Sequence, residues 1–245
     1  MNARIVWITG AVLVACGVPP NAPPGDAGST DAGSIDAGSI DAGSTDAGSD
    51  MAFDDFERTT IGPDWTSIFT PATPQVKIIG SSDLGMGAGP QGFFLMNWTK
   101  RAFLPDQFCE ATIPTDVAPG WAHQVYVRWR ASDNARYGFH YNSDPRQPTF
   151  NSWAFKYDGV PSAQTRVIAS AVATVTPQPG DTLRVEVVGF VLRGYLNGTL
   201  VLEATDTDPS RISSGVTGLA ARLSTGNTAI TADAKVWESW RGGSL

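Results

Sequence analysis

The stretch that most constrains the fold of this chain spans residues 181–203, where apolar and polar residues alternate on both sides of Asn197-Gly198. Asn-Gly between two alternating runs is the strongest short signal for a β-hairpin, because both central positions of a type I′ turn need positive φ. A second turn is predicted just before it, at Gly189-Phe190. The stretch therefore predicts three consecutive antiparallel strands.

The rest of the chain after residue 50 continues this pattern of short strands. Residues 123–130, 136–142 and 153–157 alternate between apolar or aromatic and polar residues, as half-buried strands do. Further strands are predicted over residues 53–58, 76–79, 93–98, 102–113, 166–175, 215–222 and 229–240. Many short strands without an apolar stripe of helical period predict an all-β fold, an antiparallel two-sheet β-sandwich.

Residues 1–15 have the features of an export signal. Arg4 is followed by an apolar segment of eleven residues, Ile5 to Ala15, which is too short to span a bilayer. The segment leads into Leu13-Val14-Ala15-Cys16-Gly17, which resembles the lipobox of bacterial lipoproteins. The resemblance implies that Cys16 is lipidated and becomes the mature N-terminus. The residue after the cysteine is Gly17 and not Asp, and in this the chain is similar to lipoproteins of the Gram-negative outer membrane. The alternative is an ordinary signal peptide with an incidental cysteine.

Residues 16–50 are expected to form a disordered linker. A proline-rich part is followed, from Asp26 onward, by five copies of the unit Asp-Ala-Gly-Ser-x. Such a segment buries too little apolar surface to offset about 1–2 kcal/mol per residue of ordering entropy. It lacks the Gly-Gly-x-Gly-x-Asp pattern of calcium-binding repeats, and an O-glycosylated stalk is the other alternative. A flexible tether between membrane and domain is the favoured interpretation.

The charge of the chain lies mainly in that linker. The formal net charge is −7, but residues 51–245 carry 16 Lys and Arg against 18 Asp and Glu. A nearly neutral domain has no electrostatic footprint for nucleic acid. The two cysteines are Cys16 and Cys109, and lipidation would occupy the thiol of the first, so no disulfide is expected. We expect a monomer held to the membrane by its lipid.

Several short motifs of the domain occur in an order that resembles the concanavalin A-like lectin/glucanase superfamily. They are Phe53-Asp54-Asp55-Phe56, Trp65, Val125 to Trp129, Gly180 to Val187, Tyr195 to Gly198, Gly215 to Leu219 and a Trp-rich last strand. Within that superfamily the chain is most similar to laminin-G-like and 3-keto-disaccharide-hydrolase-like jelly rolls. The resemblance implies a jelly roll over residues 51–241, followed by a tail at 242–245. It also implies that Phe53–Phe56 lies beside Val236–Trp240.

The resemblance raises the question of glycosidase chemistry, which needs two carboxyl groups flanking the scissile bond. Hydrolases of this superfamily carry spaced acids on one strand, whereas Glu110, Glu186 and Glu203 each stand alone on a predicted strand. His123 and His140 are the only histidines, and they form no zinc or nucleophile motif. Catalysis is therefore not expected.

A structural calcium ion is a further expectation from the resemblance, since such jelly rolls often hold one where the chain ends meet. Calcium requires hard oxygen ligands. The acids predicted near that point are Asp54, Asp55 and Asp233. Capping and turn roles are the alternative interpretation of these residues.

Glycan binding is the best functional prediction. A sugar site needs an aromatic platform beside hydrogen-bonding side chains. The polar faces of the three central strands offer Tyr126, Arg128, Arg130, His140, Asn142 and Lys156, and the candidate platforms are Trp98, Trp121 and Trp153. The excess of cations would suit an acidic sugar. The alternative is that the tryptophans pack in the core and the polar faces are simply solvated.

The sequence thus predicts a surface-anchored bacterial lipoprotein that displays a non-catalytic glycan-binding domain. One alternative is a glycoside hydrolase or a keto-disaccharide-hydrolase-like enzyme, which two acids at hydrolytic spacing would favour. The other is a structural or adhesive protein that binds another protein, which an apolar, featureless face would favour.

Overall fold

The computed structural model describes residues 50–68, 76–90, 93–117, 121–142, 151–158, 166–223, 229–230 and 232–245. These residues form strands and no helix, and so contain no helix that could cross a membrane. The predicted signal segment, Cys16 and almost all of the linker lie outside the described residues. The all-β prediction is confirmed.

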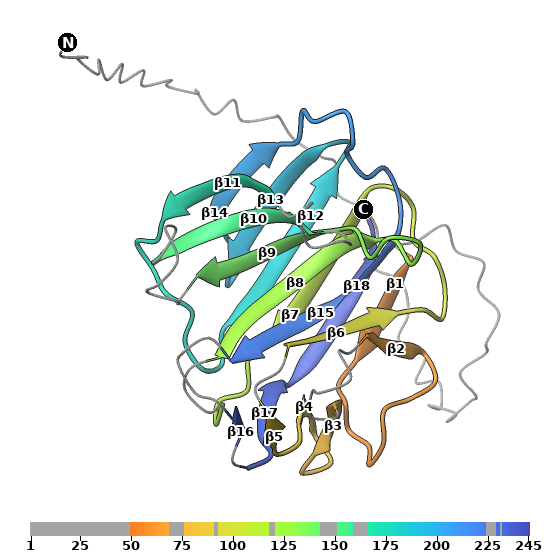
Figure 1. Cartoon of the computed structure of the whole chain (residues 1–245), viewed down its shortest axis with the longest axis vertical. Coiled ribbons are helices and arrows are strands. Elements are labelled where there is room, and N and C mark those ends of the chain that lie inside the picture. The colour runs from red at the N-terminus through yellow and green to blue at the C-terminus, as the bar shows by residue number, and fades with distance from the viewer. Residues whose placement is uncertain are drawn as a thin grey trace, which may run out of the picture. The chain divides into compact units, whose positions relative to one another are not determined.

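Two large antiparallel sheets form the domain. The six-stranded sheet contains, in spatial order, β1 (Met51–Asp54), β18 (Ser239–Ser244), β7 (Gln107–Thr112), β12 (Thr182–Val188), β13 (Val191–Leu196) and β14 (Thr199–Thr205). The seven-stranded sheet contains β11 (Arg166–Val172), β10 (Ser152–Asp158), β9 (Arg136–Asn142), β8 (Trp121–Trp129), β15 (Val216–Leu223), β6 (Phe93–Trp98) and β2 (Trp65–Ile68). Figure 1 shows the seven-stranded sheet in front of the six-stranded one.

Two smaller sheets lie at one end of the sandwich (Figure 1). One pairs β16 (Ala229–Ile230) with β5 (Gly89–Pro90). The other contains β17 (Ala234–Trp237), β4 (Asp83–Met86) and β3 (Val76–Ile79). The single terminal strand predicted over residues 229–240 is therefore wrong: the segment is divided among three sheets. The break between β17 and β18 falls at Glu238, whose backbone N–H donates to the carbonyl of Thr112 at 2.9 Å.

The core lies between the two large sheets and follows from the alternation of the strands. Val125 and Val127 of β8 and Phe139 of β9 point inward from one sheet, and Val185 and Val187 of β12 point inward from the other. All five side chains are fully buried. Because successive side chains of a strand point to opposite faces, this inward set fixes which residues of the same strands point outward.

Three tryptophans form the densest part of this core. The ring of Trp65 lies 5.4 Å from that of Trp98 and 4.8 Å from that of Trp240, centroid to centroid. The indole N–H of Trp240 points at the sulfur of Cys109 at 3.2 Å. The cluster joins β2 and β6 of one sheet to β18 and β7 of the other. It also confirms that Cys109 is a core residue.

The predicted hairpins are confirmed. Asn197 has φ of 50° and Gly198 has φ of 75°, as a type I′ turn requires, and Leu196 pairs with Thr199. The Asn197 side chain accepts a hydrogen bond from the backbone N–H of Thr182 at 2.9 Å. Val188 and Val191 pair across the other turn. The turn residues therefore fix the register of β12, β13 and β14.

The first and last strands pair as expected, with Phe53 opposite Arg241 and Asp54 opposite Trp240. The end of the domain differs from the prediction. β18 continues to Ser244, and its Gly242 and Gly243 pair with Cys109 and Phe108 of β7. Residues 242–244 are therefore part of the sheet and not a tail, because β7 offers them backbone hydrogen-bonding partners.

Candidate functional site

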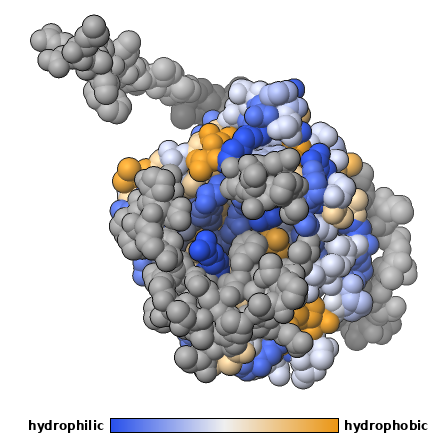
Figure 2. All heavy atoms as spheres, in the orientation of Figure 1, coloured by the Kyte–Doolittle hydropathy of each residue, from blue (hydrophilic) through white to orange (hydrophobic). Residues whose placement is uncertain are grey.

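The side of the seven-stranded sheet that faces away from the core is here called the outer face. It carries mainly polar side chains, since the apolar residues of the same strands point inward. They are Asn97, Gln124, Tyr126, Trp129, Arg136, His140, Asn142, Lys156, Asp158 and Arg222. Figure 2 looks onto this face and shows hydrophilic residues on it.

The strand register arranges these residues in two adjacent rows across the sheet. One row runs Lys156, Gly138, Tyr126, Gly218 and Asn97. The next runs Ala154, His140, Gln124, Ala220 and Leu95. Large polar or aromatic residues alternate with glycine along the first row, so that each large side chain has room to lie across a small neighbour, whereas His140 and Gln124 are adjacent in the second row.

The central part of the outer face, here called the floor, is flat because two of its residues are glycines. A Cβ atom at Gly138 would lie 1.7 Å from the Gln124 amide nitrogen, and one at Gly218 would lie 2.5 Å from the Tyr126 hydroxyl. The amide of Gln124 and the ring of Tyr126 therefore lie along the sheet. A side chain at either glycine would displace them. The floor is consequently specified by the glycines as much as by the polar residues.

Tyr126 is the best-anchored residue of this floor. Its hydroxyl lies 2.8 Å from the carbonyl oxygen of Met96 and 2.5 Å from Oδ1 of Asn97. The Arg136 guanidinium lies 5.8 Å from the ring centroid, on the ring face. Burial raises the pKa of Tyr126 well above its usual range. Tyr126 therefore remains neutral and acts as a hydrogen-bonding anchor.

His140 is the residue of the outer face whose hydrogen bonding is incomplete. Its side chain is nine-tenths buried, and in the described part of the chain its Nδ1 has no hydrogen-bond partner. Burial, followed by the positive charge of Lys156, lowers the pKa of His140 to about 3. A neutral imidazole has one donor and one acceptor nitrogen. His140 can therefore accept or donate one further hydrogen bond to a bound group.

Asp158 supplies the only carboxylate on the described part of the outer face. It lies 3.5 Å from both the Arg136 guanidinium and the Gln124 amide nitrogen. Glycoside hydrolysis needs a second carboxyl group within about 5–10 Å. The described outer face thus has the polar groups of a binding surface but not the acid pair of a glycosidase.

Arg128, which was expected on this face, turns the other way. It has φ of 55° and forms a β-bulge, since two residues of β8 lie between Tyr126 and Trp129 while only one residue of β15 lies between their partners Gly218 and Val216. The Arg128 side chain is 1% exposed and donates to the carbonyls of Pro105 at 2.9 Å and Ile212 at 2.8 Å. Arg128 is therefore a structural residue.

The same bulge reverses the expected direction of Trp129. Strict alternation along residues 123–130 would point Trp129 inward with Val125 and Val127, but it packs with Tyr126, Leu95 and Ala220 in a separate cluster on the outer face. Its indole N–H donates to Asn134 at 3.2 Å. An aromatic residue of the outer face was thus missed, because one inserted residue inverts the alternation.

Other predicted contacts also lie elsewhere. Arg130 follows the end of β8 and pairs with Asp133 in the next turn. Trp98 and Trp153 are core residues, and Trp153 stacks on Phe139 with ring centroids 5.2 Å apart. The Trp121 side chain lies outside the described residues. Of the predicted ligand contacts, the outer face retains Tyr126, His140, Asn142 and Lys156.

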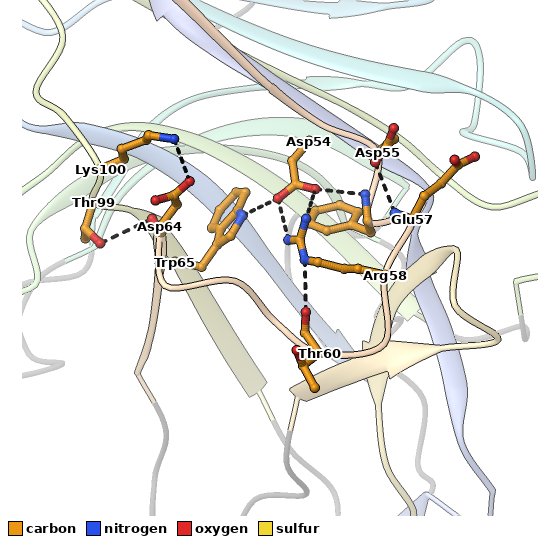
Figure 3. A network of polar contacts seen from close by, with 10 residues as sticks. Asp54, Asp55, Glu57, Arg58, Thr60, Asp64, Trp65, Thr99 and Lys100 are labelled. Atoms are coloured by element: carbon orange, nitrogen blue, oxygen red, sulfur yellow. Dashed lines mark hydrogen bonds and ion pairs between the residues drawn. The ribbon is translucent and has the colours of Figure 1, made fainter.

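The three acids proposed for calcium do not come together. Asp54 already has four partners: its carboxylate binds both terminal nitrogens of Arg58 and accepts the indole N–H of Trp65 and the backbone N–H of Phe56. Figure 3 shows these partners around Asp54, with Asp55 pointing away toward the N–H of Glu57. Asp233 pairs with Lys77. The described residues contain no group of three such side chains that could hold a metal ion.

Each of the three predicted glutamates does stand alone on its strand, but two of them, Glu110 and Glu186, are connected across the six-stranded sheet. Arg184 of β12 lies between Glu110 of β7, at 3.3 Å, and Glu186, at 2.8 Å. The hydroxyl of Tyr195 donates to Glu186 at 2.9 Å. One guanidinium therefore holds both carboxylates. The network was missed because β7 and β12 are far apart in sequence.

Comparison with known proteins supports the fold. No protein-family model and no curated protein matches the sequence. A protein of unknown function with a galectin-like fold from Bacillus subtilis is 11% identical, with a TM-score of 0.57, over 80% of this chain and 96% of that one. The pseudo β-1,3-glucanase and immunostimulatory antigen of Mycobacterium tuberculosis is 13% identical, with a TM-score of 0.54, over 81% of this chain and all of that one.

LamAcat from Zobellia galactanivorans is similar to the same degree, with 11% identity, a TM-score of 0.53 and coverage of 80% of this chain and 98% of that one. At these identities the likeness establishes the fold alone. It confirms the expected fold, a jelly roll of two antiparallel sheets. Function has to be argued from the site.

Proposed function

We propose that this domain binds glycan without hydrolysing it, through the outer face of the seven-stranded sheet. The observation that carries the proposal is the buried imidazole of His140, whose Nδ1 has no partner within the described residues. A buried polar atom without a hydrogen bond costs roughly 1–3 kcal/mol. A ligand hydroxyl that reached Nδ1 would recover that free energy.

The neighbours of His140 fit a sugar. Lys156 is its diagonal neighbour on the next strand and Gln124 is its direct neighbour on the other side. These side chains offer an ammonium group, an amide and an imidazole, which can donate to and accept from vicinal hydroxyls. The flat floor over Gly138 leaves no side chain there except the Gln124 amide. The face therefore combines several hydrogen-bonding groups with a planar surface.

The described residues of the outer face carry no acid pair, and this separates the proposal from the enzymatic alternative. Asp158 stands alone among the described carboxylates of the outer face, and it interacts with Arg136. Similar folds occur in proteins named as glucanases and as a pseudo glucanase. The fold is thus compatible with either role, and the carboxylate count favours binding.

The test is a polysaccharide pull-down with the whole mature protein on a panel of insoluble glycans. Wild type is expected to bind at least one glycan, and His140→Ala and Lys156→Ala are expected to weaken that binding tenfold or more. The matched control is Arg193→Ala, a charge removal on the opposite sheet, which should leave binding unchanged. Release of reducing sugar is expected to remain at background. Binding to none of the glycans would refute the function, and capture of a protein partner instead would favour the adhesive alternative.

The predicted lipid anchor completes the proposal. Diacylation of Cys16 would hold the protein at a bacterial outer membrane, with residues 17–50 as a tether, since more than one acyl chain anchors stably. Cys16→Ser, expressed in a Gram-negative host, is expected to move the protein from the membrane fraction to the soluble fraction. Retention of the variant in the membrane fraction would show that another segment anchors it.

A further inference from the structure

The outside of the six-stranded sheet carries a second arrangement of aromatic and polar side chains. The register sets one row across the sheet, from Phe53 through Arg241, Glu110 and Arg184 to Tyr195. Beside Phe53 this surface has a hollow of about 250 Å³, here called the Phe53 hollow. It is lined by Phe53, Glu110, Ala111, Thr112, Ser239, Trp240 and Arg241.

Phe53 is the most exposed aromatic residue that the structure describes, with 63% of its surface accessible. It lies on β1, at the edge of the sheet, directly opposite Arg241. The core gains almost nothing from a phenyl ring in this position, whereas a ligand that covered the ring would remove apolar surface from water at about 25 cal/mol per Å². Phe53 is thus placed as a platform.

The polar side of the Phe53 hollow is held in place before any ligand arrives. The Nε of Arg241 donates to Glu110 at 2.6 Å, and Glu110 also pairs with Arg184 at 3.3 Å. Arg184 in turn lies 4.1 Å from the ring centroid of Phe108. The Arg241 side chain remains 52% exposed. Its Nη2 also lies 2.5 Å from Glu110, so the N–H groups of Nη1 are the ones that can donate to a ligand at no cost in reorganisation.

We infer that the Phe53 hollow is a second sugar-binding subsite, which takes a single pyranose ring with all substituents equatorial, such as a β-glucopyranoside. Such a ring has axial C–H groups on both faces, which suit stacking on phenyl. Its hydroxyls lie around the rim, where Arg241, Glu110 and the hydroxyls of Thr112 and Ser239 can bind them. The volume is below the roughly 300–1,000 Å³ of pockets for drug-sized ligands, which fits one ring.

The other edge of the same sheet provides matched controls. Leu200 is 49% exposed and lies opposite Tyr195, at the far end of the same row. Arg193 binds Glu203 through Nε at 2.7 Å, as Arg241 binds Glu110. That edge has an exposed apolar residue and an arginine–glutamate pair but no exposed aromatic ring. A difference in sugar binding between the two edges would therefore be due to the exposed ring of Phe53.

The test is an NMR titration of the full-length protein, ¹⁵N-labelled, with methyl β-D-glucopyranoside at millimolar concentrations. The Gly242 amide and the Arg241 Nε–H signals are expected to shift saturably in wild type, Leu200→Ala and Arg193→Gln. Phe53→Ala should abolish the shifts, Phe53→Trp should strengthen binding two- to fivefold, and Arg241→Gln should weaken it. Mannitol, which has the hydroxyls but no ring face, should leave the signals unmoved.

No shift at these positions in wild type, or equal shifts in Phe53→Ala, would overturn the inference. The outcome of this titration is separate from the outcome of the test of the outer face. Sugar binding there would move the Gln124 and His140 signals instead, so either site can fail while the other stands.

Discussion

The Asp54 carboxylate and the Arg58 guanidinium form a two-point ion pair, with Nη1–Oδ1 at 2.6 Å and Nη2–Oδ2 at 2.5 Å. The carboxylate side chain is 6% exposed and the guanidinium side chain 31%. The same carboxylate accepts the indole N–H of Trp65 at 2.6 Å and the backbone N–H of Phe56 at 2.8 Å. Asp54 thus ties the first strand to the tryptophan cluster that joins the two sheets.

Replacing Asp54 by Ala is expected to lower the free energy of unfolding by about 3 kcal/mol, because it leaves buried N–H groups and a partly buried cation without partners. Urea denaturation followed by tryptophan fluorescence measures the change. Asp55→Ala is the control, since Asp55 is exposed and caps only the backbone N–H of Glu57. A control effect as large as that of Asp54→Ala would contradict the role assigned to Asp54.

Two buried histidines predict loss of stability in mild acid. Burial lowers the pKa of His123 to about 4, and burial together with the charge of Lys156 lowers that of His140 to about 3, against the ordinary 6.5. Above pH 6.5 both histidines are neutral in the folded and in the unfolded chain, so they do not change the stability. As the pH falls below 6.5, the unfolded chain binds protons that the folded chain excludes. Each histidine then removes about 1.4 kcal/mol of stability per pH unit, down to its folded pKa.

Urea denaturation at neutral pH and at about pH 5.5 checks this sign, because the lower pH is still about one unit above the ordinary glutamate pKa of about 4.3. Wild type is expected to become less stable by a few kcal/mol. The double variant His123→Gln, His140→Gln should lose much less between the two pH values, although it starts from a lower stability. A variant with the full wild-type pH dependence would show that other groups are responsible.

Cys109 is predicted to be unreactive in the folded protein. Its thiol is fully buried beneath Trp240, and burial raises its pKa to about 12, so almost no thiolate exists at neutral pH. A thiol reagent added to native Cys16→Ser protein should therefore modify Cys109 only at the rate of unfolding. The same reagent in strong denaturant should react fully within its normal time. Rapid labelling of the native protein would show that the tryptophan cluster opens.

The fold was predictable because its determinants are local. Alternation and the Asn197-Gly198 turn specify strands and hairpins without knowledge of distant residues. The glutamate network was not predictable, since Glu110 and Arg184 meet only through the pairing of β7 with β12. The outer face was predicted in part: the strands were right, but Gln124, Asp158 and Arg136 were left out of the site. Their importance depends on contacts between strands, which alternation does not reveal.

The bulge at Arg128 could not be predicted from the sequence pattern, because the residue with positive φ is neither Gly nor Asn. We expect Arg128→Ala to lower stability by about 3 kcal/mol through loss of the buried contacts to Pro105 and Ile212, while the strain of the left-handed backbone stays as in wild type. Arg128→Gly removes the same contacts without the Cβ strain, so it should be more stable than Arg128→Ala by about 1 kcal/mol.

Two measurements distinguish the two roles of this residue. One is chemical denaturation of both variants, and the other is a glycan pull-down at a temperature where both are folded. Glycan binding is expected to stay at the wild-type level in Arg128→Gly, since the side chain points away from the outer face. Equal stability of the two variants would argue against backbone strain at this bulge. Loss of glycan binding by folded Arg128→Gly would show that Arg128 belongs to the binding site.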